Sequence, residues 1–141
     1  MSGLHRLTYV SRSVRLLNMP DFNVLLEQIR PKNKQLDITG LLLYKDKTFL
    51  QVLEGKLENI NAVFEAIEHD PRHFKIKLLE HLQPCEERFF PNWSMGFFSL
   101  DDSFSMPSKF VDFFSPEFTL VSNSQYHDEL VKLLLYFQKN S

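Results

Sequence analysis

Apolar and polar residues recur along the chain with two different periods, and these periods predict its elements. Five segments alternate as β-strands do, and two segments between them repeat apolar residues as α-helices do. The strand-like segments are residues 4–10, 38–44, 49–55, 74–79 and 93–98, and the helical stripes run from Phe22 to Ile29 and from Leu57 to Ile67. This order, βαββαββ, predicts an α+β sandwich of ferredoxin-like topology.

The pattern changes after Asp101 and Asp102. Residues 107–114 are expected to form a short helix, and a longer final helix is marked by Leu130, Leu133, Leu134 and Phe137. We expect these two additional C-terminal helices to cover the other face of the sheet. Residues 1–102 are therefore expected to carry the sheet, and residues 103–141 to form a helical cap of the same domain.

Pro31 falls near the end of the first predicted helix. Proline disfavours the helical conformation at the residue before it, which is Arg30. We therefore expect the helix to end near Pro31. Asn33 is then expected at or just beyond the helix end, close to the side that faces the sheet.

One polar side chain interrupts an apolar strand face. Phe49, Gln51 and Leu53 point the same way in an extended strand, so the amide of Gln51 is expected to be buried. A buried amide is costly unless its donors and its acceptor have partners. The first and third strands are neighbours in a ferredoxin-like sheet, which brings the hydroxyl of Tyr9 within reach of that amide.

Trp93 and Met95 are two residues apart in the last predicted strand. They are expected to share a face and to form a wall of the same pocket. Taken on the residues alone, ordinary packing explains each of these positions as well. A tyrosine at a strand end, a lone tryptophan and one satisfied glutamine are common features of protein cores.

Composition and charge exclude several classes of protein. The chain has 141 residues and a net charge of −2, and its Lys and Arg residues form no run, so we expect no basic stripe and no nucleic-acid partner. Cys85 is the only cysteine, and Pro71 breaks the helix that would align His69 with His73, so no metal site is expected. Without an apolar leader or a membrane-spanning run, a cytoplasmic location and no membrane partner are expected.

Several segments, in this order, resemble the BLUF domains, which are blue-light sensors that use FAD. They are LTYVS at residues 7–11, Asn33, DITGLL at 37–42, FLQVLEG at 49–55, DPRH at 70–73 and WSM at 93–95. The resemblance implies the ferredoxin-like fold, with the flavin held between two helices. It also implies that residues 1–102 are the flavin-binding domain.

The resemblance assigns expected roles to individual residues. Tyr9 is similar to the tyrosine that gives an electron and a proton to the excited flavin, and Gln51 to the glutamine between that tyrosine and the N5/O4 edge of the ring. Asn33 is similar to the asparagine that bonds the pyrimidine edge. Ile38 is expected to be an apolar wall of the flavin pocket. Arg72 and His73 are expected to lie near the cofactor, and Trp93 and Met95 are expected to relay the signal.

The resemblance implies a photoreceptor that turns over no substrate. Light-driven transfer from Tyr9 is expected to rearrange the hydrogen bonds of Gln51, and the output is expected to pass to an unidentified downstream protein or to self-assembly as a homo-oligomer. Two alternatives share the topology. An acylphosphatase-like hydrolase would use Arg12 or Arg15 after the first strand, and a ligand-free interaction module would carry no chromophore.

Overall fold

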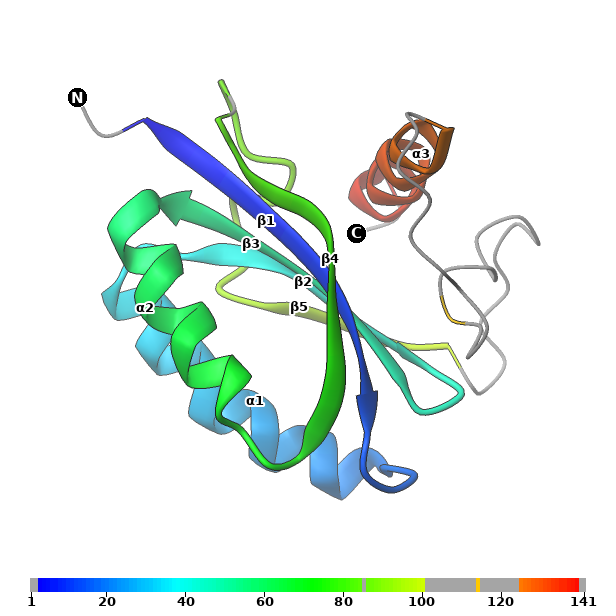
Figure 1. Cartoon of the computed structure of the whole chain (residues 1–141). Coiled ribbons are helices and arrows are strands. Elements are labelled where there is room, and N and C mark those ends of the chain that lie inside the picture. Colours follow the sequence, from blue (N-terminus) through cyan, green and yellow to red (C-terminus); the bar gives the residue numbers. More distant parts are fainter. Residues whose placement is uncertain (1–2, 85, 101–113, 115–124, 140–141) are drawn as a thin grey trace.

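The computed structural model describes residues 3–84, 86–100, 114 and 125–139 of the chain. The elements follow the predicted order and confirm the α+β fold (Figure 1). They are β1 (Leu4–Ser13), α1 (Met19–Gln35), β2 (Thr39–Lys45), β3 (Thr48–Lys56), α2 (Leu57–Glu68), β4 (His73–Pro84), β5 (Gly96–Ser99) and α3 (Gln125–Lys139). Cys85 and the short helix expected at residues 107–114, apart from Phe114, lie outside the described residues.

The five strands form one sheet in the order β4-β1-β3-β2-β5. Neighbouring strands are antiparallel, except that β5 runs parallel to β2. The predicted pairing of the first and third strands is confirmed, and its register places Tyr9 directly opposite Gln51.

Helices cover both faces of this sheet (Figure 1). On one face, α1 and α2 pack over a core that includes Leu7, Phe22 and Ile60. On the other, the predicted stripe of α3 is buried against Val10 and Leu50 of the sheet. Each strand supplies both cores because its side chains alternate between the two faces. The prediction that the final helix covers the second face is confirmed.

The first helix is longer than its sequence predicts. Asn18 and Asp21 form a reciprocal cap at its N-terminus, in which each side chain accepts a hydrogen bond from the other's backbone N–H. Pro31 lies inside the helix, which continues to Gln35. The prediction that the helix ends near Pro31 was therefore wrong. Buried contacts of Asn33, which is 2% exposed, stabilise the last turn and outweigh the local preference of the proline.

The last strand is shorter than predicted and begins only at Gly96. Trp93 and Met95 therefore precede it, and the prediction that they share a strand face was wrong. Met95 packs in the core beneath α1 and α2, whereas Trp93 packs against the core beneath α3. Gly96 makes room for the indole, since a Cβ there would lie 2.1 Å from Trp93 Cε3.

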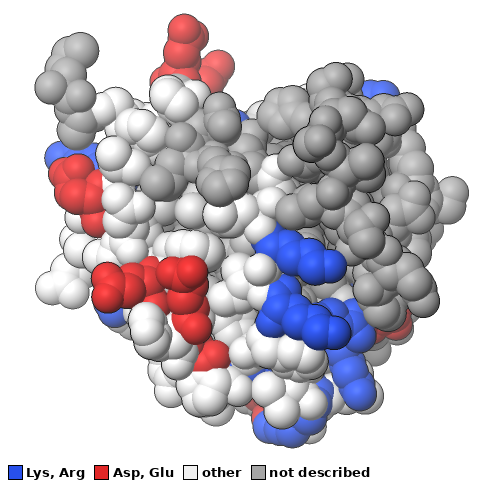
Figure 2. All heavy atoms as spheres, viewed as in Figure 1, with Lys and Arg blue, Asp and Glu red and all other residues white. Residues whose placement is uncertain are grey.

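Charged side chains are segregated on the face of the molecule shown in Figure 2. Figure 2 shows acidic groups over α2 and a gathering of basic groups on the other side of the same face. Among the described helices, none is long and apolar enough to span a membrane.

Candidate functional site

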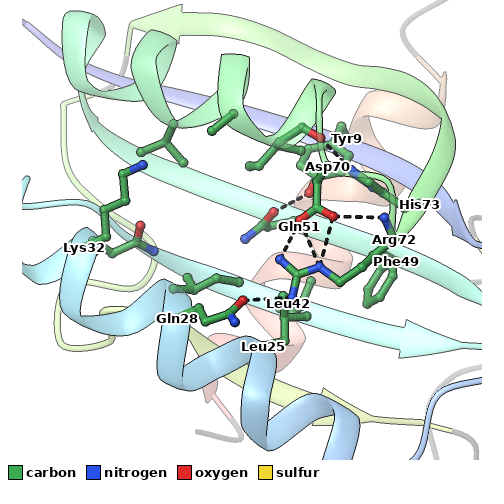
Figure 3. A pocket seen from close by; sticks show the side chains of 15 residues that line it. Tyr9, Leu25, Gln28, Lys32, Leu42, Phe49, Gln51, Asp70, Arg72 and His73 are labelled. Carbon is green, nitrogen blue, oxygen red and sulfur yellow. Dashed lines mark hydrogen bonds and ion pairs between the residues drawn. The ribbon is translucent and has the colours of Figure 1, made fainter.

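A cleft of about 190 Å³ lies between α1 and α2 and reaches down to the sheet (Figure 3). Its walls are apolar where the two helices face each other, and polar groups converge on it from the strands and from the turn before β4. Fifteen residues line it: Tyr9, Leu25, Gln28, Ile29, Lys32, Asn33, Leu42, Phe49, Gln51, Val63, Ala66, Ile67, Asp70, Arg72 and His73. An apolar cleft with a few convergent polar groups is the usual form of a small-molecule site.

The floor of the cleft holds a hydrogen bond between two buried side chains. The hydroxyl of Tyr9 donates to Oε1 of Gln51, and each residue is 3% exposed. Burial, and to a lesser degree the nearby Asp70 carboxylate, raises the pKa of Tyr9 well above its ordinary value. The phenol therefore stays protonated and acts as the donor, which leaves the amide oxygen as the acceptor.

The other end of the same amide is held weakly. Nε2 of Gln51 donates to Sδ of Met95 at 3.5 Å, and a thioether is a poor acceptor. Among the described residues this sulfur is the only hydrogen-bond partner of Nε2, which carries two N–H groups. The amide is thus fixed at its oxygen and retains donor capacity at its nitrogen, beside the cleft.

Asn33 reaches the cleft from the last turn of α1. Its Nδ2 donates to the backbone oxygen of Ser94 at 2.8 Å, while its Oδ1 has no hydrogen-bond partner among the described residues. Lys32, on the same turn, also lines the cleft and makes no ion pair with any residue that the structure describes. No role was predicted for Lys32, and the structure places it in the lining on the part of α1 that continues past Pro31.

Arg72 crosses the mouth of the cleft (Figure 3). It comes from the turn between α2 and β4, and its Nη1 donates to Oε1 of Gln28 on α1 at 3.0 Å. Its Nε and Nη2 bond the carboxylate of Asp70 at 2.6 to 3.0 Å. Hydrogen bonds within this pair lower the pKa of Asp70 and raise that of Arg72. Arg72 therefore lines the cleft, and a carboxylate already pairs with its charge.

His73 lines the cleft with its ring, while protein groups bond both of its nitrogens. Nε2 lies 2.7 Å from the carbonyl of Ile67, and Nδ1 lies 2.7 Å from Oγ of Ser11. A carbonyl only accepts, so Nε2 carries a proton, and a neutral ring then accepts from the hydroxyl of Ser11. The ring centroid is 6.2 Å from that of Tyr9, which makes His73 part of the packing around the phenol.

Three of the expected site residues lie outside the cleft lining. Ile38 is completely buried in the core near Gly55, where a Cβ on the glycine would lie 3.2 Å from Ile38 Cγ1. Its expected place as a wall of the pocket therefore differs from the structure. Met95 contacts Gln51 from beneath, and Trp93 stacks on Phe90 on the opposite face of the sheet, so they do not wall one pocket.

The polar groups of the cleft fit a flavin ring system. Walls formed by Leu25, Ile29 and Ile67 suit a planar apolar body. Free donor capacity at Gln51 Nε2 and a free acceptor at Asn33 Oδ1 suit a ring edge that carries both acceptors and a donor. Among the described residues no group of three or more His, Cys, Asp or Glu side chains is placed to hold a metal ion.

The fold and the cleft together define a small α+β cofactor-binding domain. The profile of the BLUF family, described as sensors of blue light using FAD, matches residues 4–96. The chain belongs to this family, whose cofactor is FAD.

Similar proteins agree with this assignment. The dark-state structure of BlrB, a BLUF protein, is 30% identical and superposes with a TM-score of 0.75, covering 100% of this chain and 99% of that one. The ground state of BlsA is 29% identical with a TM-score of 0.73, covering 94% of this chain and 87% of that one. The photoactivated adenylate cyclase subunit beta of Euglena longa is 35% identical over 95 residues, which are 67% of this chain and 11% of the cyclase.

Proposed function

We propose that this chain senses blue light through FAD in the cleft between α1 and α2, and that it passes the signal on by a conformational change without turning over a substrate. The observation that carries the proposal is the buried hydrogen bond from Tyr9 to Oε1 of Gln51, beside a weakly held Nε2. When bound, the flavin supplies absorption of blue light and, once excited, oxidising power. Side chains of this protein carry out the other steps.

Tyr9 is suited to be the electron and proton donor. Burial keeps its hydroxyl protonated, so the group holds a proton that it can release when it loses an electron. The atom placed to receive that proton is Oε1 of Gln51, with which the hydroxyl is already hydrogen-bonded. Water has little access to this exchange, because both residues are 3% exposed.

Gln51 is suited to be the part that moves. Rotation of its amide exchanges Oε1 and Nε2, which replaces the hydrogen bond from Tyr9 and releases the contact with Met95. Each neutral hydrogen bond contributes about 0.5–1.5 kcal/mol, so the two orientations differ by a small free energy. A difference of this size changes the populations of two states and leaves the fold intact.

Other residues are proposed to hold the cofactor. Oδ1 of Asn33 and the amide of Gln51 would bond the ring edge, and His73 would support the phenol by packing. Arg72 and Lys32, two cations of the lining, would face the charged tail of FAD. Ile38 would act on the site from the core behind it, not as a wall.

Met95 and Trp93 are proposed to relay the signal from the sheet. Met95 touches the amide of Gln51, and Trp93 packs toward α3 on the opposite face. Residues 1–102 would then form the flavin-binding part, and residues 103–141 the cap that receives the change. A downstream protein or a second copy of the chain would read it. The chain spans about a tenth of the curated cyclase relatives, 11% of the first of them, and their activity is not carried over.

The hydrolase alternative loses support at its key residues. Nη1 of Arg12 donates to Oγ1 of Thr48 and to the backbone oxygen of Asp46, and Arg15 forms a two-pronged pair with Asp21. Neither arginine lines the cleft. An acylphosphatase-like mechanism needs such a cation free to bind the phosphate, and neither is placed for it.

Absorption spectra of the purified protein before and after blue illumination test the proposal. We expect a yellow protein whose oxidised flavin spectrum shifts slightly to the red and returns in the dark. Gln51→Leu and Tyr9→Phe should keep the colour and lose the shift. Tyr44→Phe is the matched control, since Tyr44 is fully buried in the same sheet but bonds Ser13 and Leu17 outside the cleft. A colourless protein, or a normal shift in Gln51→Leu, would refute the proposal.

A further inference from the structure

The connection from β4 to β5, the two edge strands, runs past the end of β3 and the start of β2, and we term its residues Arg88–Met95 the strap. Its first residues lie on the α3 face, where Phe89 and Phe90 join the core beneath α3. Its last residue, Met95, lies on the cleft face in contact with Gln51. The strap therefore contacts both the proposed photoactive amide and the core of the final helix.

A buried carboxylate holds the first part of the strap. The side chain of Glu54 on β3 is completely buried and accepts hydrogen bonds from the backbone N–H groups of Phe89 at 2.8 Å and Phe90 at 2.9 Å. Its charge is balanced by Arg6 on β1, whose Nε lies 3.0 Å away. Arg6 also lies 4.2 Å over the ring of Phe89. A buried charge is stable only when paired in this way, so this geometry is strongly specified.

Arg88 adds a second attachment beside the first. Its Nη1 donates to Oγ1 of Thr39 at 2.8 Å and to the backbone oxygen of Glu54 at 3.2 Å. Its Nη2 donates to the backbone oxygen of Asp37 at 2.9 Å. These acceptors belong to β2, β3 and the turn before β2, so the first part of the strap is tied to the sheet itself.

Three backbone oxygens hold the other end of the strap on the cleft side. The N–H of Gly40 donates to Trp93 at 3.0 Å, Asn33 donates to Ser94 at 2.8 Å, and Arg30 donates to Met95 at 3.0 Å. Two of these donors come from α1, the helix that walls the cleft. A change at Gln51 or Asn33 therefore acts directly on this end.

The aromatic side chains of the strap pack with the core beneath α3. Phe90 and Trp93 stack at 5.7 Å, and Trp93 contacts Phe98, which in turn contacts Phe137 of α3 at 5.1 Å. Gln138 of α3 donates to the backbone oxygen of Phe89 at 2.9 Å. The contacts of α3 with the strap thus lie at the first attachment, at Phe89, and at the rings of Phe90 and Trp93 that pack with the same core.

We propose that Glu54 is a positioning residue that gives the strap a fixed point, so that displacement of Met95 is passed to α3. This inference rests on the proposed photosensor function. A segment held at one end would absorb a displacement by rotating its own backbone bonds. A segment held at both ends passes a displacement of one end to the rings packed along it, and here these are Phe90 and Trp93, which stack on each other beside the core of α3. Glu54 acts on the signal without touching the cleft, whose lining does not include it.

Glu54→Gln tests this function in the full chain. The variant removes the charge that attracts both N–H groups and Arg6, and keeps the volume. We expect exchange of the Phe89 and Phe90 amides to accelerate on the order of tenfold, since they lose bonds to a charged acceptor. The flavin red shift should remain, while the light-induced change in hydrogen exchange of α3 should be lost. Asp37→Asn is the matched control, because that carboxylate is 80% exposed and contacts Arg88 without holding the strap N–H groups.

Gln138→Ala keeps the inference testable if Glu54→Gln does not fold. It removes the contact of α3 with Phe89 at an exposed position and leaves Glu54 unchanged. We expect a normal red shift and a reduced light-induced change in α3. A normal red shift with an unaltered α3 response, in Glu54→Gln or, where that variant does not fold, in Gln138→Ala, would overturn the relay through the strap and leave the photosensor intact. Absence of any red shift in the unmodified protein would instead overturn the proposed function.

Discussion

A double-mutant cycle on Tyr9 and Gln51 measures the hydrogen bond on which the proposed photocycle depends. Gln51→Leu leaves the hydroxyl of Tyr9 buried without its acceptor, and Tyr9→Phe leaves Oε1 of Gln51 without its donor. A buried polar group left unsatisfied costs about 1–3 kcal/mol, so each single change should lower the free energy of unfolding by that amount. The double variant removes both groups together, and its loss should be smaller than the sum by about 1 kcal/mol.

Urea unfolding of the flavin-free protein provides the assay. The chain contains one tryptophan, Trp93, whose fluorescence reports on packing against α3 and is separate from the mutated pair. If the free energy of unfolding falls with urea concentration at the same slope in all variants, they unfold in the same way. If the double variant loses the sum of the single losses to within about 0.3 kcal/mol, the two side chains are not coupled and the reasoning fails.

Three further predictions concern Tyr9 and Asp70 in the cleft and Gly40 in the sheet. Burial raises the pKa of Tyr9, so the phenol keeps its proton in the folded protein above pH 10, near the pKa of the unfolded chain. The free energy of unfolding should therefore fall as the pH rises beyond about 10. Alkaline unfolding curves of Tyr9→Phe should lack this fall. Arg72 lowers the pKa of Asp70, so this ion pair stabilises the fold above about pH 4 and the stabilisation is lost in acid. Asp70→Asn should reduce the acid dependence of the free energy of unfolding, and an unchanged dependence would contradict this reasoning. Gly40→Ala should cost at least about 1–3 kcal/mol in thermal unfolding, since its Cβ would lie 1.8 Å from the Val52 oxygen, whereas Gly3→Ala, with 3.7 Å to His5, should be neutral.

The fold was largely predictable because the recurrence of apolar residues that marks strands and helices is a local property of the sequence. Alternation in the strands and the stripes of the helices follow directly from the geometry of each element, so the order βαββαββ could be predicted. Pairing of β1 with β3 followed from the topology, and with it the meeting of Tyr9 and Gln51. The end of α1 and the start of β5 could not be predicted, because contacts with distant residues decide where these elements stop.

Polar contacts of the site were the least predictable part. Gln51 was identified because an amide on an apolar strand face is a local anomaly that needs a partner. The roles of Ser94 and Gln28 gave no such signal, since one contributes a backbone oxygen and the other is an ordinary exposed helix residue. Arg72 and His73 were expected at the site, but only the structure showed that Asp70, Ser11 and Ile67 already engage their polar groups.

Side-chain chemistry and local period, both written in the sequence, determined which residue types lie on which face and that one amide would be buried beside a phenol. Tertiary structure alone decided that Met95 and Trp93 lie on opposite faces of the sheet, and that Glu54 is buried under the strap with Arg6 as its counter-ion. The physical reason is range. Periodicity acts over a few residues, whereas the strap is positioned by hydrogen bonds between groups 34 to 65 residues apart.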